Sequence, residues 1–392
     1  MRRLVELMSS FKKAARLSRR SIPELLVESL RLRLSGRQLG LAEYFEFRLF
    51  HNDLTFAEKA QFGGYRTQAM LEELLVDDYS KILSIDKLTM YALFKGLGLP
   101  APEARGVYGR QVPVGFCRTL DTLGQLVDYL KLPGSLPVYM KPAYGSYGRG
   151  NILIERATGA GFQLGDGSIV APEALGGMLP NPAGLGWLLQ EPLESHADIA
   201  ACCGRKISGV RVHTFLTSRG PVITKVVWRI NVGNQDSDNF RDGQSGNMAA
   251  AVDPTTGVVE RVINGIGFSQ TVADRTAMAD QNRDALRYCG FQLPCWDEVK
   301  KLALDAALAL PGYINPGWDI AICADGPRIL EVNYFGDLDF PQHSHRLGYL
   351  DHSLMVLLQD RQLAMYVDQK PNHKKKCKNN GRIGSRQCHW PW

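Results

Sequence analysis

Alternating apolar and polar residues near the C-terminal end of the chain predict a β-hairpin. In residues 317–323 the apolar side chains fall on one face of a strand, and Asp319 falls on the other. An Asp-Gly turn follows at residues 325–326, and the next strand ends at Asn333 with Glu331 on the same face. Folding about this turn places Asp319 roughly opposite Glu331.

Helical spacing dominates the first 80 residues, whereas helices and strands mix from residue 84 onward. Leu25, Leu26, Ser29, Leu30 and Leu34 recur at the spacing of an amphipathic helix, and Thr55 with Glu58 has the pattern of a capping box. Further helices are predicted at 85–97, 121–131, 296–310 and 353–365, and strands at 138–141, 150–155, 185–191, 207–217 and 221–230. The 392 residues can therefore form two or three domains, or one large composite domain.

Composition is that of an ordinary soluble protein, but charge is unevenly distributed. The net charge is +6, and residues 1–20 carry seven basic side chains and one acidic one. Residues 369–392 carry seven basic side chains and no acidic one, so the remainder of the chain is mildly acidic. The ends are either solvated, partly disordered segments or contacts for a membrane surface or polyanion. We expect no membrane span and no signal peptide, and we expect a cytoplasmic protein that is either free or peripheral to the inner face of the membrane.

Three oxygen-bearing side chains converge in the predicted C-terminal hairpin. Asp319, Glu331 and Asn333 provide two carboxylates and an amide oxygen, which suit a hard divalent cation such as Mg²⁺. Magnesium sites of this kind usually serve bound phosphates, so a phosphate-binding segment is expected elsewhere in the chain.

Lys141 begins the segment that best fits phosphate binding. It precedes a glycine-rich loop between two short strands, whose candidate binding residues are Gly145, Ser146, Gly148 and Gly150. Glycines let backbone N–H groups approach phosphate oxygens, and the lysine adds a positive charge. An ordinary glycine-rich turn is an equal alternative. The chain contains no P-loop motif.

Two further segments have polar groups in positions that suit nucleotide binding. Gln190, Glu191 and Glu194 end an apolar strand, where they can contact adenine and ribose or simply face solvent. Arg211, Lys225 and Arg229 share one face of the predicted hairpin and need anionic partners, either structural carboxylates or phosphates. Arg346 is a candidate for a substrate carboxylate or belongs to a surface loop.

These residues resemble the ATP-grasp superfamily, specifically the sugar-transfer-associated ATP-grasp proteins, over roughly residues 84–345. The resemblance rests on four segments in order: 85–102, Lys141-Pro142 with the glycine loop, Leu189–Glu191 with Val210–Val212, and Gly317–Ile320 with Leu330–Asn333. It implies an α+β ATP-grasp fold, two α+β subdomains that clamp ATP, here preceded by a helical N-terminal region.

The resemblance also implies a role for each matching residue. Lys87 and Lys141 match lysines that contact ATP phosphates, Gln190 and Glu191 match the adenine hinge, and Glu194 matches a ribose contact. Arg211 matches the arginine that stabilises the transferring phosphate, and Asp319, Glu331 and Asn333 match the magnesium ligands. The implied cofactors are ATP and two Mg²⁺ ions, with Mn²⁺ as a substitute.

The predicted organisation follows from these matches. We expect a helical region at 1–83, ATP-grasp subdomains at 84–192 and 193–350, a helix at 351–368 and a basic, disordered tail at 369–392. Tail residues His373, Cys377, Cys388 and His389 leave metal binding open.

The resemblance implies an ATP-dependent carboxylate–amine ligase that works through an acylphosphate. Its substrates would be a small carboxylate and an amine, such as a sugar acid or glycan precursor and an amino acid, with no nucleic acid partner. A peptide ligase of natural-product assembly, a phosphotransferase and a nucleotide-binding scaffold remain as alternatives.

Overall fold

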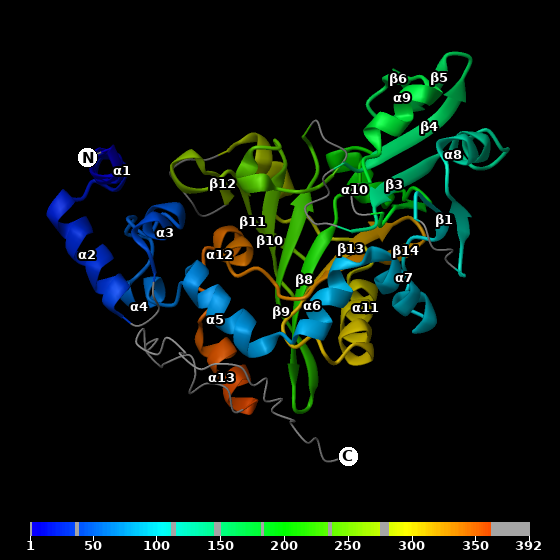
Figure 1. Cartoon of the computed structure of the whole chain (residues 1–392). Coiled ribbons are helices and arrows are strands. Elements are labelled where there is room, and N and C mark those ends of the chain that lie inside the picture. Colours follow the sequence, from blue (N-terminus) through cyan, green and yellow to red (C-terminus); the bar gives the residue numbers. More distant parts are fainter. Residues whose placement is uncertain are drawn as a thin grey trace, which may run out of the picture.

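The computed structural model describes residues 2–35, 39–110, 115–144, 150–181, 184–233, 237–274 and 282–361. Within them, an N-terminal group of helices precedes two seven-stranded sheets (Figure 1). The blue helices α1 to α4 lie at one end of the molecule, and strands β4 to β6 lie at the opposite end. None of the helices in the described part combines the length and apolar character needed to cross a bilayer.

The predicted helical N-terminal region is confirmed. Its helices are α1 (Arg2–Ser18), α2 (Ile22–Leu34), α3 (Leu41–Glu46), α4 (Phe56–Lys59), α5 (Tyr65–Leu75) and α6 (Asp78–Ile85). Thr55 caps α4 with Glu58 in the predicted capping box. In α2, however, Leu25, Ser29 and Leu32 face the core, whereas Leu26, Leu30 and Leu34 are exposed. The apolar residues of α2 therefore do not form a single buried stripe.

The N-terminal helices are fastened to the C-terminal part of the chain. The Gln342 side chain bonds both backbone polar groups of Gly63, at 2.8 and 2.9 Å. The Arg346 guanidinium binds both carboxylate oxygens of Asp53 at 2.9 Å. Arg346 is thus a structural link between the two regions; it lies in the connection after residue 345, and its predicted contact with a substrate carboxylate stays a prediction.

The first sheet has the strand order β2-β1-β7-β3-β4-β5-β6. Its strands are β1 (Ala104–Tyr108), β2 (Arg118–Leu120), β3 (Val138–Pro142), β4 (Ile152–Thr158), β5 (Gly161–Leu164), β6 (Ile169–Val170) and β7 (Trp187–Gln190). Helices α7 (Lys87–Gly96), α8 (Leu123–Leu130) and α9 (Pro172–Met178) accompany it. Leu126 and Leu175, from α8 and α9, pack with Ile154 and Trp187 of the sheet in one apolar cluster.

The second sheet has the order β12-β11-β10-β9-β8-β13-β14. Its strands are β8 (Val210–Thr217), β9 (Gly220–Ile230), β10 (Met248–Val252), β11 (Val259–Asn264), β12 (Thr271–Asp274), β13 (Gly317–Cys323) and β14 (Gly326–Asn333). Helix α11 (Trp296–Ala309) covers one face, and α12 (Asp339–His345) packs against β9 to β11. The remaining helices are α10 (Ala197–Cys203) and α13 (His352–Asp360), with short 3₁₀ turns at 241–243, 267–269 and 284–288.

The hairpin of β13 and β14 has the register that the sequence predicts. Asp319 pairs directly with Glu331, and Gly317 pairs with Asn333. Trp318 and Ile320 point to the other side, into the apolar cluster under α11. The sheet boundaries agree with the predicted subdomains, whose limits stay a prediction. Predictions for 362–392, including the tail metal site, lie outside the described residues.

Candidate active site

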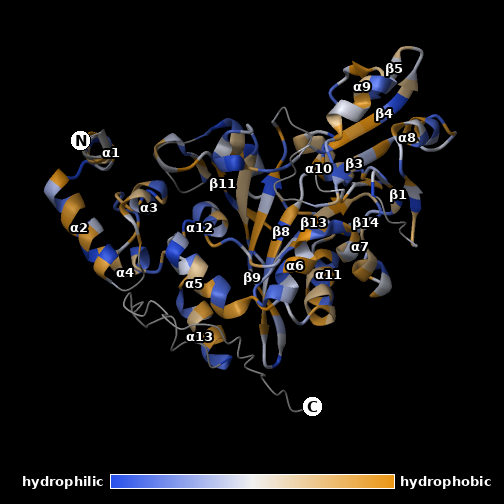
Figure 2. Ribbon diagram, in the orientation of Figure 1, coloured by the Kyte–Doolittle hydropathy of each residue, from blue (hydrophilic) through white to orange (hydrophobic). Residues whose placement is uncertain are grey.

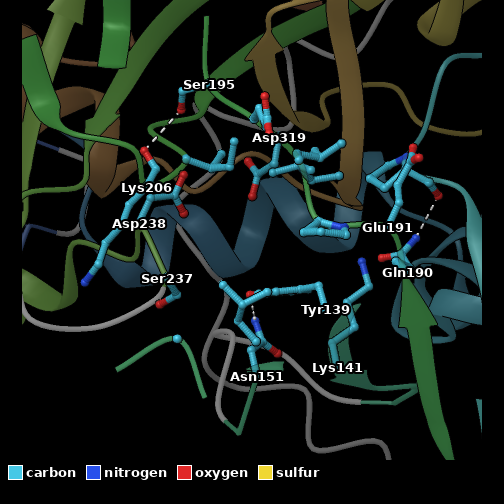
Figure 3. Close-up of a pocket in the computed structure, with 18 of the residues that line it drawn as sticks. Tyr139, Lys141, Asn151, Gln190, Glu191, Ser195, Lys206, Ser237, Asp238 and Asp319 are labelled. Atoms are coloured by element: carbon cyan, nitrogen blue, oxygen red, sulfur yellow. Dashed lines mark hydrogen bonds between the residues drawn. The ribbon is translucent and has the colours of Figure 1, made fainter. Parts of the chain in front are cut away.

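A cavity of about 780 Å³ lies between the two sheets. Lys141 and Gln190 reach it from the first sheet, and Asp319 reaches it from the second (Figure 3). Glu331 lines it from the second sheet too. Glu191 and Glu194 line it as well, as does Lys87. Its size is that of a small-molecule site, and residues far apart in the sequence meet in it.

Two lysines enter the cavity next to Glu331. Lys87 is the first residue of α7, and its backbone N–H donates to Ala143 at 2.9 Å, which holds the helix start against the end of β3. Burial lowers the pKa of Lys141 to about 8, although the nearby Glu331 charge opposes this shift. Burial also lowers the pKa of Lys87. Two cations in a buried place are costly without anions, which makes this corner receptive to phosphate.

Asp319 lies at the centre of a buried ion network. Its Oδ1 accepts from Arg211 Nε at 2.7 Å, and its Oδ2 accepts from Arg211 Nη2 at 3.0 Å and Arg229 Nη1 at 2.9 Å. Burial alone would raise the pKa of Asp319, but the two guanidinium groups outweigh it and hold the pKa well below its usual range. Asp319 is therefore an anion throughout the physiological pH range.

Glu331 is paired with Asp319 but has a different electrostatic environment. Burial raises its pKa, and the Asp319 charge adds to this effect, while Lys87 and Lys141 oppose it. A positive ion between the two carboxylates would relieve their repulsion. Asp319 Oδ1 accepts one of these three hydrogen bonds and Oδ2 accepts the other two, so Oδ1 retains capacity for another partner. The donor set thus fits a hard divalent cation.

Asn333 lies at the end of β14, on the face that carries Glu331. Its Nδ2 donates to the Gly317 carbonyl at 3.3 Å, and it is not among the described residues that line the cavity. The structure therefore brings Asp319 and Glu331 together in the cavity and leaves Asn333 beside them.

The predicted adenine-hinge residues, Gln190 and Glu191, lie at the cavity, and several of their polar groups already have hydrogen-bond partners in the protein. The Gln190 side chain donates to the Pro102 carbonyl at 3.0 Å. The Glu191 carboxylate accepts from the Glu103 N–H at 2.9 Å, and Glu191 N–H donates to the Glu103 carbonyl at 3.0 Å. Glu194 lines the cavity wall. All three residues line the cavity, and their contacts with adenine and ribose stay a prediction.

Lys225 is not brought into this cavity. It shares a face with Arg211 and Arg229 but lies farther along β9, where its Nζ is 3.5 Å from Asp351 Oδ2. It lines a second cavity of about 440 Å³, together with Tyr349 and residues of α13. Among the predicted glycine-loop residues, Gly145, Ser146 and Gly148 lie outside the described residues. Gly150 is described and has a φ of +85°, in the region that favours glycine.

Several lining residues were missed by the sequence analysis. Tyr139 lies two residues before Lys141 on β3 and accepts from Asn151 Nδ2 at 2.8 Å, so strand alternation could have revealed it. Lys206 also lines the cavity, but it lies in a short connection with no recognisable motif. Asp238 lines the cavity as well; its Oδ2 lies 3.1 Å from Arg229 Nη2, so it extends the ion network.

The sequence profile of the sugar-transfer associated ATP-grasp family matches residues 69–356. The chain therefore belongs to this family, which confirms the predicted ATP-grasp fold. A comparison with curated proteins gives no match.

Solved structures also resemble the chain. N5-carboxyaminoimidazole ribonucleotide synthetase from Thermotoga maritima is 13% identical, with 70% of this chain and 52% of the other covered and a TM-score of 0.35. An L-amino acid ligase from Bacillus licheniformis is 11% identical, with 71% of this chain and 49% of the other covered and a TM-score of 0.37. Biotin carboxylase from Campylobacter jejuni is 10% identical, with 79% of this chain and 53% of the other covered and a TM-score of 0.39. The chain spans about half the length of these proteins.

Proposed function

We propose that this protein is an ATP-dependent ligase that joins a carboxylate to an amine through an acylphosphate. The observation that supports it is the convergence of Lys87 and Lys141 with Asp319 and Glu331 in one cavity. Lysines on one side would hold the phosphates of a nucleotide, and carboxylates on the other would hold a divalent cation that offsets the phosphate charge.

In this proposal the lysines bind the phosphates of ATP and the carboxylates bind the metal ion. Lys87 and Lys141 hold the phosphate oxygens, and Gln190 with Glu191 lies where the base would bind. Asp319 and Glu331 would hold Mg²⁺, with Asn333 as a third candidate ligand and Mn²⁺ as a substitute. The cation would neutralise charge on the phosphates as the phosphoryl group moves.

Arg211 and Arg229 are the proposed stabilisers of the transferring phosphoryl group. Both guanidinium groups bond Asp319, and of the two arginines Arg229 lines the cavity. In the first step a substrate carboxylate oxygen attacks the γ-phosphorus and ADP leaves. In the second step the amine attacks the acyl carbon, phosphate leaves and the amine loses a proton. Neither step requires a nucleophile from the protein.

The family description supports a sugar-linked substrate. We propose a sugar acid or a cell-surface glycan precursor as one reactant and an amino acid or another amine as the other. The need for ATP supports a cytoplasmic location. In the described chain, Lys87 is the first cavity-lining residue, so α1 to α6 do not contribute to the nucleotide cavity itself.

The test is a screen of uronic acids and amino acids, singly and in pairs, for substrate-dependent ADP release, with products read by mass spectrometry. A ligase gives ADP, phosphate and an amide in equal amounts. A phosphorylated product without free phosphate would indicate a phosphotransferase instead. Binding of MgATP without any turnover across the screen would favour a scaffold.

A further inference from the structure

Helix α2 has two apolar faces, and within the described residues one of them is buried and the other is exposed. Leu25 and Leu32 are buried in a cluster with Phe11 of α1 and the aromatic residues of α3 and the following turn. On the opposite face, Val27, Leu30 and Leu34 are 59%, 52% and 75% exposed. The spacing of these three residues places them on one stripe along the helix. Leu26, beside them, is 36% exposed.

Two basic side chains flank this stripe on α2, and further basic side chains are exposed on α1. Arg31 and Arg33 are exposed and lie on either side of it along α2. On α1, Lys12 and Arg16 are exposed on the same helix face as Val5 and Met8. Residues 2–34 contain nine basic and three acidic side chains. One of the acids, Glu28, is already engaged by Arg20 and Lys59, so the outer surface is strongly positive.

The stripe lies far from the proposed chemistry. Figures 1 and 2 show α1 and α2 at the end of the molecule opposite the first sheet. None of the residues that line the 780 Å³ cavity comes from them. Arg48, from the turn after α3, fastens this region to the body through a 2.9 Å bond to the Gln270 carbonyl. The helices can therefore contact a large surface without closing the cavity.

We propose that α1 and α2 dock the protein on an anionic lipid surface. Exposed leucine and valine flanked by arginine and lysine match the requirements of an interface between acyl chains and acidic headgroups. A second copy of the chain would bring two positive surfaces together, which is unfavourable. The C-terminal residues 369–392 carry seven basic side chains and no acid, so they are repelled as well. The lipid surface is the occupant with complementary charge.

The test is sedimentation of the full-length protein with vesicles of equal parts phosphatidylglycerol and phosphatidylcholine, and with vesicles of phosphatidylcholine alone. We expect binding to the anionic vesicles and much weaker binding to the neutral ones. Replacing Val27, Leu30 and Leu34 together by Ser should weaken anionic binding roughly a hundredfold, because their transfer into the interface is lost. Replacing Lys12, Arg16 and Arg33 by Gln should weaken it roughly fivefold per residue.

A matched control replaces three exposed apolar residues elsewhere, Ile82, Leu308 and Val356, by Ser. It should bind vesicles as the unchanged protein does, and all variants should retain the thermal unfolding midpoint and MgATP affinity. Equal loss in the control would overturn the proposal, as would equal binding to both kinds of vesicle. It would also fail if the α2 variant converted a dimer to a monomer in light scattering without changing vesicle binding. That result would identify a second copy of the chain as the partner.

Discussion

The two faces of the second sheet carry different kinds of buried side chains, apolar on one face and charged on the other. Under α11, Val212, Trp228 and Ile320 form a dry apolar core. On the opposite face of the same strands, Arg211, Arg229 and Asp319 form a buried ion network. Residues adjacent in sequence thus serve stability on one face and chemistry on the other, because strand side chains alternate.

On the charged face, the buried arginines and carboxylates neutralise one another's charges. Removing one partner from a buried ion pair leaves an unpaired charge, which costs about 3–5 kcal/mol. Asp319 is shared by two arginines, so substitutions there confound stability with function. Glu331 is not the shared partner of these two arginines. A substitution there therefore separates an effect on function from an effect on stability better than one at Asp319.

The largest expected effect is that of Glu331→Gln on turnover. The change keeps the side-chain shape but removes the proposed metal-ligating charge. Substrate-dependent ADP release should fall by about a thousandfold or more, equivalent to roughly 4 kcal/mol of barrier. Since burial raises the pKa of Glu331, a neutral side chain is well tolerated there, and the thermal midpoint should not fall. Unchanged ADP release would refute the site assignment.

Ile322→Ala, on the apolar face of the second sheet that α11 covers, should lower stability and leave function unchanged. Ile322 is 2% exposed within the main core, so its truncation should cost about 3 kcal/mol of unfolding free energy. MgATP affinity, measured by calorimetry well below the melting temperature, should stay within about twofold because no cavity residue changes. A large loss of affinity at unchanged stability would show that the two faces are not separable.

Much of the site could be predicted because its signals are local. The Asp-Gly turn and strand alternation fix the register that pairs Asp319 with Glu331. Helical periodicity is less decisive for α2. Leu25, Ser29 and Leu32 lie on one face of the helix, and Leu26, Leu30 and Leu34 lie on another. Helical periodicity alone does not say which of the two faces is buried. That choice is made by tertiary contacts with Phe11 and Tyr44, which are distant in sequence from much of the helix.

A smaller effect is expected from the charge state of Lys141. Its pKa of about 8 means that it is mostly protonated below pH 8 and loses its charge as pH rises. Nucleotide phosphates favour the charged form, so MgADP affinity should fall through this range, by at most about tenfold per pH unit. In Lys141→Arg, whose charge persists at high pH, this dependence should flatten. Calorimetric titration between pH 6.5 and 9.5 checks it, and an equally steep fall in the arginine variant would point to another group.

The smallest effect is expected at Lys225, on the same strand and face as Arg229. Its partner is Asp351 at 3.5 Å, and a partly exposed pair of this kind contributes about 0–1 kcal/mol. Lys225→Gln should therefore change MgATP affinity and ADP release by no more than about twofold, whereas Arg229→Gln should lower turnover by about a hundredfold or more. The two variants differ in position by four residues and share one sheet face, so they separate the cavity from the rest of that face. A loss of turnover in Lys225→Gln comparable to that in Arg229→Gln would mean that the functional surface extends along β9 to the second cavity.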